Sequence, residues 1–569
     1  MDRAITVTMD MHMQLGASNS QRNIKAVYAK CASAFVLTLL TSSAMANKLT
    51  IDGEVNIVTA YRDIDSDGQS GGISSLSVVP GLNSVYKSKK LFFRGNVNTT
   101  YVTRDSDTGT TEDYFTNYNY QSRLSVIENL LNFEVKGERQ YRASELNNLF
   151  VTDFVNNSDG LVKTEQNAAS LSLETKRGKL MNVKGLARYA RVTADGGSQV
   201  VVNNVSNDLV NVDLSLKSGV KSRFIWNIDG SYDNTVSGTN QGQDQTSQSV
   251  NALVDVPVYK GLAVRFTGTD SSNEFGAQGT KDTITREFQT YGAGLTMYFS
   301  SNTYVSITYN NASSPTINPQ DEFENQDETF LGIDLRWALS PRTFIAYNRS
   351  RRFYGDSSGG RLQYQTRKTR ATLSYTETVT NASQLIATEQ QGLFICPAGA
   401  TNILSCSVSE TLDYEPAADE VLVNFAIPDY AIEDFALLRR STSAAFAFNF
   451  NRLSVGINAS YVDSESLANV SSQQNNATSG SMTLGYEIGP YTTMNATMRY
   501  IDFDQVIETT EQSSRTKALS MGINRSFGRQ LKASFSYIYT DRNGTLSDNV
   551  FGTNYKDNRL ALSVSYTTN

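Results

Sequence analysis

The strongest constraint on the fold is a strict alternation of apolar and polar side chains. In LNFEVKGERQY, residues 131–141, Leu131, Phe133 and Val135 share one register and strongly polar residues occupy the other. The same period of two recurs along the chain, for example in residues 91–101, 181–189, 224–232, 453–461 and 531–539. A period of two is typical of β-strands with one polar face. The chain is therefore predicted to be all-β.

The connections between these segments indicate which kind of all-β fold is formed. Tight turns such as KSKK (87–90), LSPR (339–342) and FGRQ (527–530) alternate with long polar connections such as 142–165 and 311–326. Sandwiches and propellers also have alternating strands, but short turns on one rim and long loops on the other are typical of outer-membrane barrels. We expect a large antiparallel transmembrane outer-membrane β-barrel of about 22 to 24 strands, with short periplasmic turns and longer extracellular loops.

One region, residues 380–436, interrupts the regular order of strands. The flanking segments 364–376 and 440–450 are both expected to descend toward the short turns, so an ascending passage must lie between them. Residues 420–427, EVLVNFAI, are the best candidate for a strand there. The alternatives are a plug in the lumen and a plain folded loop.

The same insert contains Cys396 and Cys406, whereas the third cysteine, Cys31, lies near the N-terminus. In an exported chain, two cysteines in a loop that contains Gly and Pro are expected to form a disulfide. This disulfide would pin the insert. Free redox thiols are the alternative.

The N-terminus predicts the compartment. A basic stretch that ends at Lys30 precedes the apolar run CASAFVLTLLTSSAMA, which ends in the small-x-small signal AMA at residues 44–46. We expect residues 1–46 to be a signal peptide. Residues 47–569 are then expected to form a barrel in the outer membrane of a Gram-negative bacterium.

Composition excludes several classes of function. The only histidine, His12, lies in the expected signal peptide. The exported chain therefore has no histidine for a Ser-His-Asp triad or for a zinc site. We expect neither an enzyme nor a bound cofactor. The formal net charge of −7 is unsuited to nucleic acid, which is not an expected partner.

The two registers of the strands predict two sets of functional side chains. Tyrosines of the apolar register lie where ascending strands end, and an aromatic girdle at the outer interface is expected from Tyr61, Tyr101, Tyr141, Tyr189, Tyr232, Tyr309, Tyr347, Tyr461, Tyr500 and Tyr539. The polar register is expected to line the lumen with Arg94, Glu134, Lys136, Glu138, Lys184, Arg188, Asp229, Asp334, Arg336, Lys368 and Arg370. This mixture of signs favours a wet channel or a cross-linked interior over an ion-selective pore.

Two local features need separate interpretation. Arg139 is a charge in the lipid register, which is tolerable because it lies two residues from the girdle residue Tyr141. In DIDSDG (63–68), the residues Asp63, Asp65 and Asp67 resemble the opening of a calcium loop, but Ser74 stands where that loop has Glu. A solvated acidic turn is the alternative that this departure favours.

The stretches 335–383 and 437–461, together with VVPGLNSVYKSKKLFFRGNVNTTYV (78–102), resemble the outer-membrane barrel family associated with PEP-CTERM/exosortase and exopolysaccharide gene systems. The resemblance implies a channel or scaffold for export or surface assembly of exopolysaccharide. It implies outer-membrane lipid, polysaccharide and periplasmic export proteins as partners, and it carries over no catalytic residues. A general diffusion porin for small solutes and a closed structural or adhesion barrel that acts through its loops are the alternatives.

Overall fold

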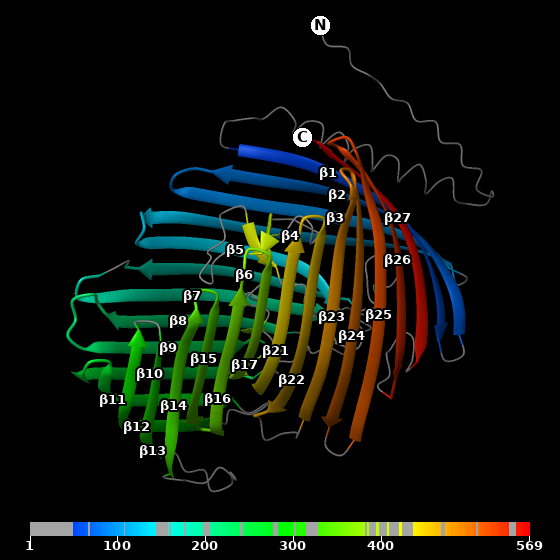
Figure 1. The fold of residues 1–569 in the computed structure, drawn as a ribbon. Coiled ribbons are helices and arrows are strands. Elements are labelled where there is room, and N and C mark those ends of the chain that lie inside the picture. The colour runs from blue at the N-terminus through cyan, green and yellow to red at the C-terminus, as the bar shows by residue number, and fades with distance from the viewer. Residues whose placement is uncertain are drawn as a thin grey trace, which may run out of the picture.

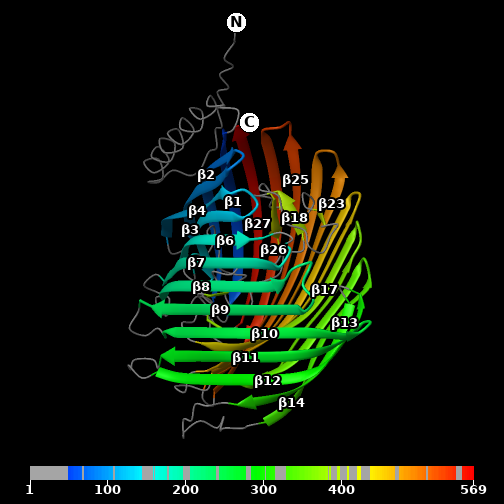
Figure 2. The same cartoon turned by 90° about the vertical axis from the view of Figure 1, so that its left-hand side faces the viewer.

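The wall of the molecule is one antiparallel sheet of 24 strands. Each strand pairs with its two neighbours, and β1 (Leu49–Ser66) pairs both with β2 (Gln69–Lys87) and with the last strand, β27 (Tyr555–Thr568). The sheet is therefore closed into a barrel (Figures 1 and 2). The closed barrel confirms the predicted fold class.

The computed structural model describes residues 49–66, 69–106, 109–143, 158, 161–175, 178–196, 205–238, 243–276, 283–300, 303–313, 328–381, 384–385, 394–397, 407–408, 420–423, 436–467, 473–507, 510–545 and 554–568. The expected signal peptide, 1–46, lies outside these residues. Within the described part of the chain, no helix is long and apolar enough to cross a membrane.

The remaining wall strands follow one another in chain order. In the first half they are β3 (Leu91–Ser106), β4 (Gly109–Ile127), β5 (Leu131–Ala143), β6 (Leu161–Glu174), β7 (Met181–Gly196), β8 (Val205–Ser218), β9 (Ile225–Ser237), β10 (Gln245–Tyr259), β11 (Leu262–Gly276) and β12 (Thr283–Ser300). In the second half they are β13 (Thr303–Ser313), β14 (Glu328–Ser340), β15 (Thr343–Arg352), β16 (Gly355–Gln365), β17 (Thr369–Thr380), β21 (Leu437–Phe450), β22 (Leu453–Ser466), β23 (Gln473–Gly489), β24 (Thr492–Ile507), β25 (Thr510–Phe527) and β26 (Leu531–Gly544).

The two rims of the barrel differ in their connections. On the short-turn rim, where β1 begins, Gly261 and Asn451 adopt positive φ angles of 77° and 50°, as tight turns require. The opposite rim, here called the long-loop rim, is more varied than expected. Its connections β1–β2, β3–β4, β15–β16 and β24–β25 span only two residues each. The expectation of a long loop at every such position is wrong there, because those strands continue to pair as hairpins, as Asp65 does with Ser70.

A turn at residues 366–368, which the alternation does not indicate, separates β16 from β17. The Thr366 hydroxyl accepts hydrogen bonds from the backbone N–H groups of Lys368 (3.3 Å) and Thr369 (3.0 Å). This side-chain capping closes the turn without glycine or proline. Strands β16 and β17 run antiparallel, so the expectation that residues 364–376 form one descending strand is wrong.

Because β17 already ascends, the wall needs no further strand from the insert, and β17 pairs directly with β21. Within the insert, β19 (Ser407–Val408) and β20 (Glu420–Val423) pair with β18 (Phe394–Pro397) in a separate three-stranded sheet. Both views show this small sheet within the outline of the wall (Figures 1 and 2). The expectation of a wall strand at 420–427 is therefore wrong.

The two faces of the wall differ in chemistry as the alternation predicts. On the outer face, Phe133 and Tyr189 are 38% and 48% exposed, whereas on the inner face Arg62 is fully buried. Buried apolar side chains, among them Ala190, Val192 and Leu209, form small clusters on the inner face. An apolar exposed exterior around a polar interior is typical of a transmembrane barrel.

Candidate functional site: the lumen and its mouth

The residues predicted to line the lumen lie mostly in the inner register. They occupy β3 (Arg94), β5 (Glu134, Lys136 and Glu138), β7 (Lys184 and Arg188), β9 (Asp229), β14 (Asp334 and Arg336) and β17 (Arg370). Lys368 is the exception, because it lies in the turn between β16 and β17 with its Nζ 3.8 Å from the centre of the Phe450 ring. Lys368 thus belongs to the short-turn rim, and the unpredicted turn is the reason.

Glu134 shows how the charges on the inner face are compensated. Its carboxylate accepts hydrogen bonds from Gln121 Nε2 at 3.0 Å and from Arg123 Nε at 2.9 Å. Both donors lie on the neighbouring strand β4, and Arg123 is the direct cross-strand partner of Glu134. Sequence reasoning missed these two donors, since it did not fix the pairing of β4 with β5.

A buried ionic network of the inner face is centred on Arg265. Its Nε and Nη2 donate to the two carboxylate oxygens of Asp255, both at 2.8 Å, and its Nη1 donates to Asp334 Oδ2 at 2.7 Å. The side chains of Arg265 and Asp255 are 3% and 0% exposed. Tyr304 adds an O–H donor to Asp334 at 3.0 Å. A bidentate guanidinium–carboxylate pair of this kind is strong and geometrically specific.

The sequence contains a signal for this network that alternation alone does not reveal. Asp255 and Arg265 lie at mirrored positions around the tight turn at Lys260 and Gly261, and they are direct cross-strand partners. Opposite charges at equal distances from a hairpin turn are expected to meet. Of the network, the sequence-based prediction included only Asp334.

A second buried network joins the first and last strands. Asp557 accepts hydrogen bonds from Arg62 Nε (2.9 Å) and Arg559 Nε (2.5 Å), and all three side chains are at most 5% exposed. Arg62 and Arg559 are direct partners in the ladder. Asp557 therefore compensates two like charges that would otherwise repel each other across the closing strands.

The ends of the insert contact strands across the mouth, defined here as the end of the lumen at the long-loop rim. Asn381 Nδ2 donates to Gln245 Oε1 at 3.1 Å, and the backbone N–H of Ala436 donates to Gln243 Oε1 at 2.9 Å. These contacts connect the β17–β21 side of the wall to the start of β10. Strands β11 to β16 lie between β10 and β17 in the wall, so the contacts bridge the mouth.

An apolar cluster reinforces this bridge. It consists of Phe275, Phe353, Tyr354, Val379, Ala436, Leu438 and Leu467. The Phe275 and Phe353 ring centres are 6.3 Å apart, and the Arg286 guanidinium lies 5.8 Å from the centre of the Phe353 ring. The ends of β11, β17, β21 and β22 are thereby packed together with the turn between β15 and β16.

Neutral hydroxyl pairs recur on the inner face of the wall. Four serine pairs lie at direct cross-strand positions with Oγ–Oγ distances of 2.5–2.8 Å: Ser231 with Ser249, Ser374 with Ser443, Ser460 with Ser479, and Ser534 with Ser563. These serines alternate along their strands with exposed outer residues such as Tyr232 and Phe535. The lumen therefore presents hydroxyl groups between its paired charges.

The tyrosines predicted for the girdle fall into two groups. Six are exposed on the outer face: Tyr61, Tyr189, Tyr232, Tyr309, Tyr347 and Tyr461. Four are partly buried: Tyr101, Tyr141, Tyr500 and Tyr539. The Tyr141 ring packs edge-on against Phe115, with ring centres 5.1 Å apart, and Phe115 is only 8% exposed. The described pairing of β4 with β5 ends at Tyr118 and Arg139, so this contact lies beyond it.

The remaining predicted sites receive no support as binding sites. Asp63 and Asp65 lie in the extended strand β1 rather than in a calcium loop, and Asp67 lies outside the described residues. Among the described residues, no group of three or more His, Cys, Asp or Glu side chains is placed to hold a metal ion. Cys396 lies in β18, and Cys406 lies outside the described residues, so the disulfide stays a prediction.

Comparisons with known proteins give structural likeness only. No protein-family model matches the chain, and no curated protein sequence matches it. The FrpB iron transporter of Neisseria meningitidis in its apoprotein form (F5-1 variant) is similar at 9% identity and a TM-score of 0.43, over 91% of this chain and 81% of that chain. A loop-deletion mutant of OmpT, an outer-membrane protein of Vibrio cholerae, is similar at 11% identity and a TM-score of 0.29, over 91% of this chain and 99% of that chain.

Proposed function

We propose that the protein is a channel in the outer membrane of a Gram-negative bacterium that takes part in export or surface assembly of exopolysaccharide. The observation that carries this proposal is the hydroxyl-lined inner face, with serine pairs such as Ser231–Ser249 and Ser460–Ser479. Such groups both donate and accept hydrogen bonds, so they can exchange partners with the hydroxyl groups of a passing sugar chain.

The paired charges of the lumen support a neutral or mixed cargo over a single type of ion. Arg265 is paired with Asp255 and Asp334, and Glu134 with Arg123. Charges that are satisfied within the wall present little net potential to the lumen. Selectivity for one ionic sign needs a ring of uncompensated charge instead.

The experiment that tests the proposal combines conductance with polymer export. We expect the purified barrel to conduct weakly in a planar bilayer, and to conduct more after residues 381–436 are replaced by a short turn. This change removes the three-stranded sheet β18–β20 together with Asn381 and Ala436, whose hydrogen bonds bridge the mouth. A strain lacking the protein is expected to accumulate polysaccharide inside the cell envelope.

Two results would replace this function by an alternative. Uptake of small sugars through the barrel with unchanged surface polymer would favour the diffusion porin. The absence of conductance in both the intact and the deleted barrel would favour the closed structural or adhesion barrel.

A further inference from the structure

The lipid-facing wall of β5–β8 carries a group of six charged side chains. Three ion pairs lie in the register of the exposed outer residues Phe133, Leu171 and Tyr189: Arg139 with Glu165 (2.6 Å), Lys163 with Asp195 (3.3 Å) and Arg191 with Asp208 (3.7 Å). In each pair the two residues are direct partners on neighbouring strands. We call these six side chains the outer charged patch.

The depth of the patch in the bilayer is indicated by the free-energy cost of charge in lipid and by one girdle residue. A basic residue on the lipid face of a barrel costs about 2–4 kcal/mol at the bilayer midplane and about 0–1 kcal/mol near the interface. Six charges are therefore tolerable together only at the level of the lipid headgroups. Tyr189, a predicted girdle residue, donates its O–H to Asp208 at 2.7 Å, which joins the patch to the aromatic girdle.

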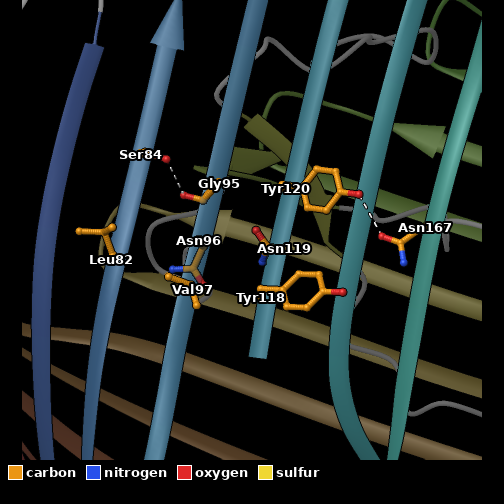
Figure 3. A pocket seen from close by; sticks show the side chains of 9 residues that line it. All are labelled: Leu82, Ser84, Gly95, Asn96, Val97, Tyr118, Asn119, Tyr120 and Asn167. Carbon is orange, nitrogen blue, oxygen red and sulfur yellow. Dashed lines mark hydrogen bonds between the residues drawn. The ribbon is translucent and has the colours of Figure 1, made fainter. Parts of the chain in front are cut away.

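An apolar groove of about 430 Å³ lies beside the patch on the same face. Its lining includes Leu82, Val97, Tyr118, Tyr120 and Asn167. Figure 3 shows the Tyr118 and Tyr120 rings extending from β4 toward β5, with the Tyr120 hydroxyl directed at Asn167 on β6. The exposed Val97 places the groove on the outer wall, because its 39% exposure matches that of the other lipid-facing side chains.

Two residues shape the groove and connect it to the patch. Gly137 on β5 lies beneath the Tyr120 ring, since a Cβ atom there would be 2.4 Å from Tyr120 Cε1. The Arg139 guanidinium lies 5.0 Å from the centre of the Tyr118 ring. The aromatic side of the groove and the nearest cation of the patch are therefore in contact.

We propose that the outer charged patch and the groove together bind a phosphorylated glycolipid. Arg139, Lys163 and Arg191 bind its phosphate groups, because charge-assisted hydrogen bonds to phosphate are strong. Their partners, among them Glu165 and Asp208, accept hydrogen bonds from its sugar hydroxyls. One acyl chain occupies the groove between Leu82 and Tyr120. The patch spans four strands, about 14 Å at the usual strand spacing, which suits a phosphorylated disaccharide better than a single phosphodiester headgroup.

The test uses the full-length barrel, purified in a non-ionic detergent, with lipid A and phosphatidylglycerol in competition. Native mass spectrometry then measures which lipid each barrel retains. We expect the unmodified barrel to retain lipid A about tenfold more than phosphatidylglycerol. The triple variant Arg139→Gln, Lys163→Gln, Arg191→Gln is expected to lose this preference.

Three further variants separate the groove from the patch and control for side-chain size and for general charge. Val97→Trp fills the groove and is expected to lower lipid A retention several-fold, whereas Val212→Trp, on the outer face of β8, leaves it unchanged. Removing the cation of three ion pairs elsewhere, with Lys89→Gln, Arg349→Gln and Arg515→Gln, is also expected to leave lipid A retention unchanged.

Three outcomes would overturn the proposal. One is equal retention of phosphatidylglycerol by the unmodified barrel, and another is unchanged lipid A retention in the patch variant. The third is a second copy of the chain bound at this face in place of lipid. The heat-dependent gel mobility of folded barrels shows that each variant is folded before its lipids are measured.

Discussion

Arginine–carboxylate pairs occur on both faces of this wall, and the two sets differ in burial and in partners. On the inner face, Arg265 is 3% exposed and contacts two carboxylates. On the outer face, Arg139 is 31% exposed and is paired with one carboxylate, that of Glu165. A buried pair depends on both partners, because removing one leaves an uncompensated charge away from water. An exposed pair can change partners at little cost. The inner network therefore maintains the wall, and the outer pairs remain available to a ligand.

The largest expected effect comes from breaking the inner network. Arg265→Met leaves Asp255 and Asp334 without their cation, and we expect the free energy of unfolding to fall by about 3–5 kcal/mol. Urea unfolding of the barrel in lipid vesicles, followed by gel mobility, measures the change.

A matched variant tests whether burial is the cause. Arg191→Met removes the cation of an exposed outer pair and is expected to change stability far less. Equal losses in the two variants would contradict the difference between the inner and outer pairs.

The next largest effect concerns the packing of the outer face. Gly137→Leu places a side chain where the Tyr120 ring and Asn167 already lie, and overpacking of this kind costs about 1–3 kcal/mol. The second substitution Tyr120→Ala is expected to restore much of the loss, because it removes the ring. If the double variant is as unstable as Gly137→Leu, the ring is not the obstacle. The same urea unfolding measures both variants.

A neutral buried contact separates the effect of burial from that of charge. Asn381 and Gln245 are each 2% exposed and hydrogen-bonded at 3.1 Å across the mouth. A double-mutant cycle with Asn381→Ala and Gln245→Ala is expected to give a coupling energy of about 1 kcal/mol. A coupling energy near zero would show that the bridge across the mouth does not depend on this contact.

The smallest effect is expected at a single outer pair. Arg191→Gln is expected to lower the free energy of unfolding by about 0.2–1 kcal/mol, since Arg191 and Asp208 are 59% and 43% exposed. The effect should shrink as salt is added to the unfolding buffer, because salt screens exposed charges. A loss that does not depend on salt would indicate a packing role instead.

The sequence predicted those strands in which apolar and polar side chains alternate. The alternation from Leu131 to Tyr141 predicted β5, and its outer register correctly included the exposed Phe133. A closed barrel is then required, because backbone groups within lipid must all be hydrogen-bonded. Alternation cannot supply the pairing of one strand with the next, and so Arg265, Asp255 and the two donors to Glu134 were missed.

The residues at the turns before and after β16 explain the remaining errors in the predicted order of strands. The turn after β16 is closed by the Thr366 side chain, and threonine is also common within strands. Strands β15 and β16 are joined by Phe353 and Tyr354, two residues that also favour strands. The expected strand at residues 364–376 therefore runs through the turn at 366–368, and β17 receives the wrong direction. This direction then requires a wall strand inside the insert that the barrel does not need.

The pairing of β1 with β27 has a consequence for how the chain reaches this state. Gly53 N–H donates to Thr568 Oγ1 at 2.9 Å although the two residues are 515 positions apart in the sequence. Contacts between such distant residues form slowly, because the intervening chain must first be ordered. Until they form, the first and last strands both present unpaired backbone groups, which invite pairing with other chains. The rate of barrel closure therefore determines how long these two strand edges stay unpaired. The Arg62–Asp557 ion pair joins β1 to β27, so its formation marks closure.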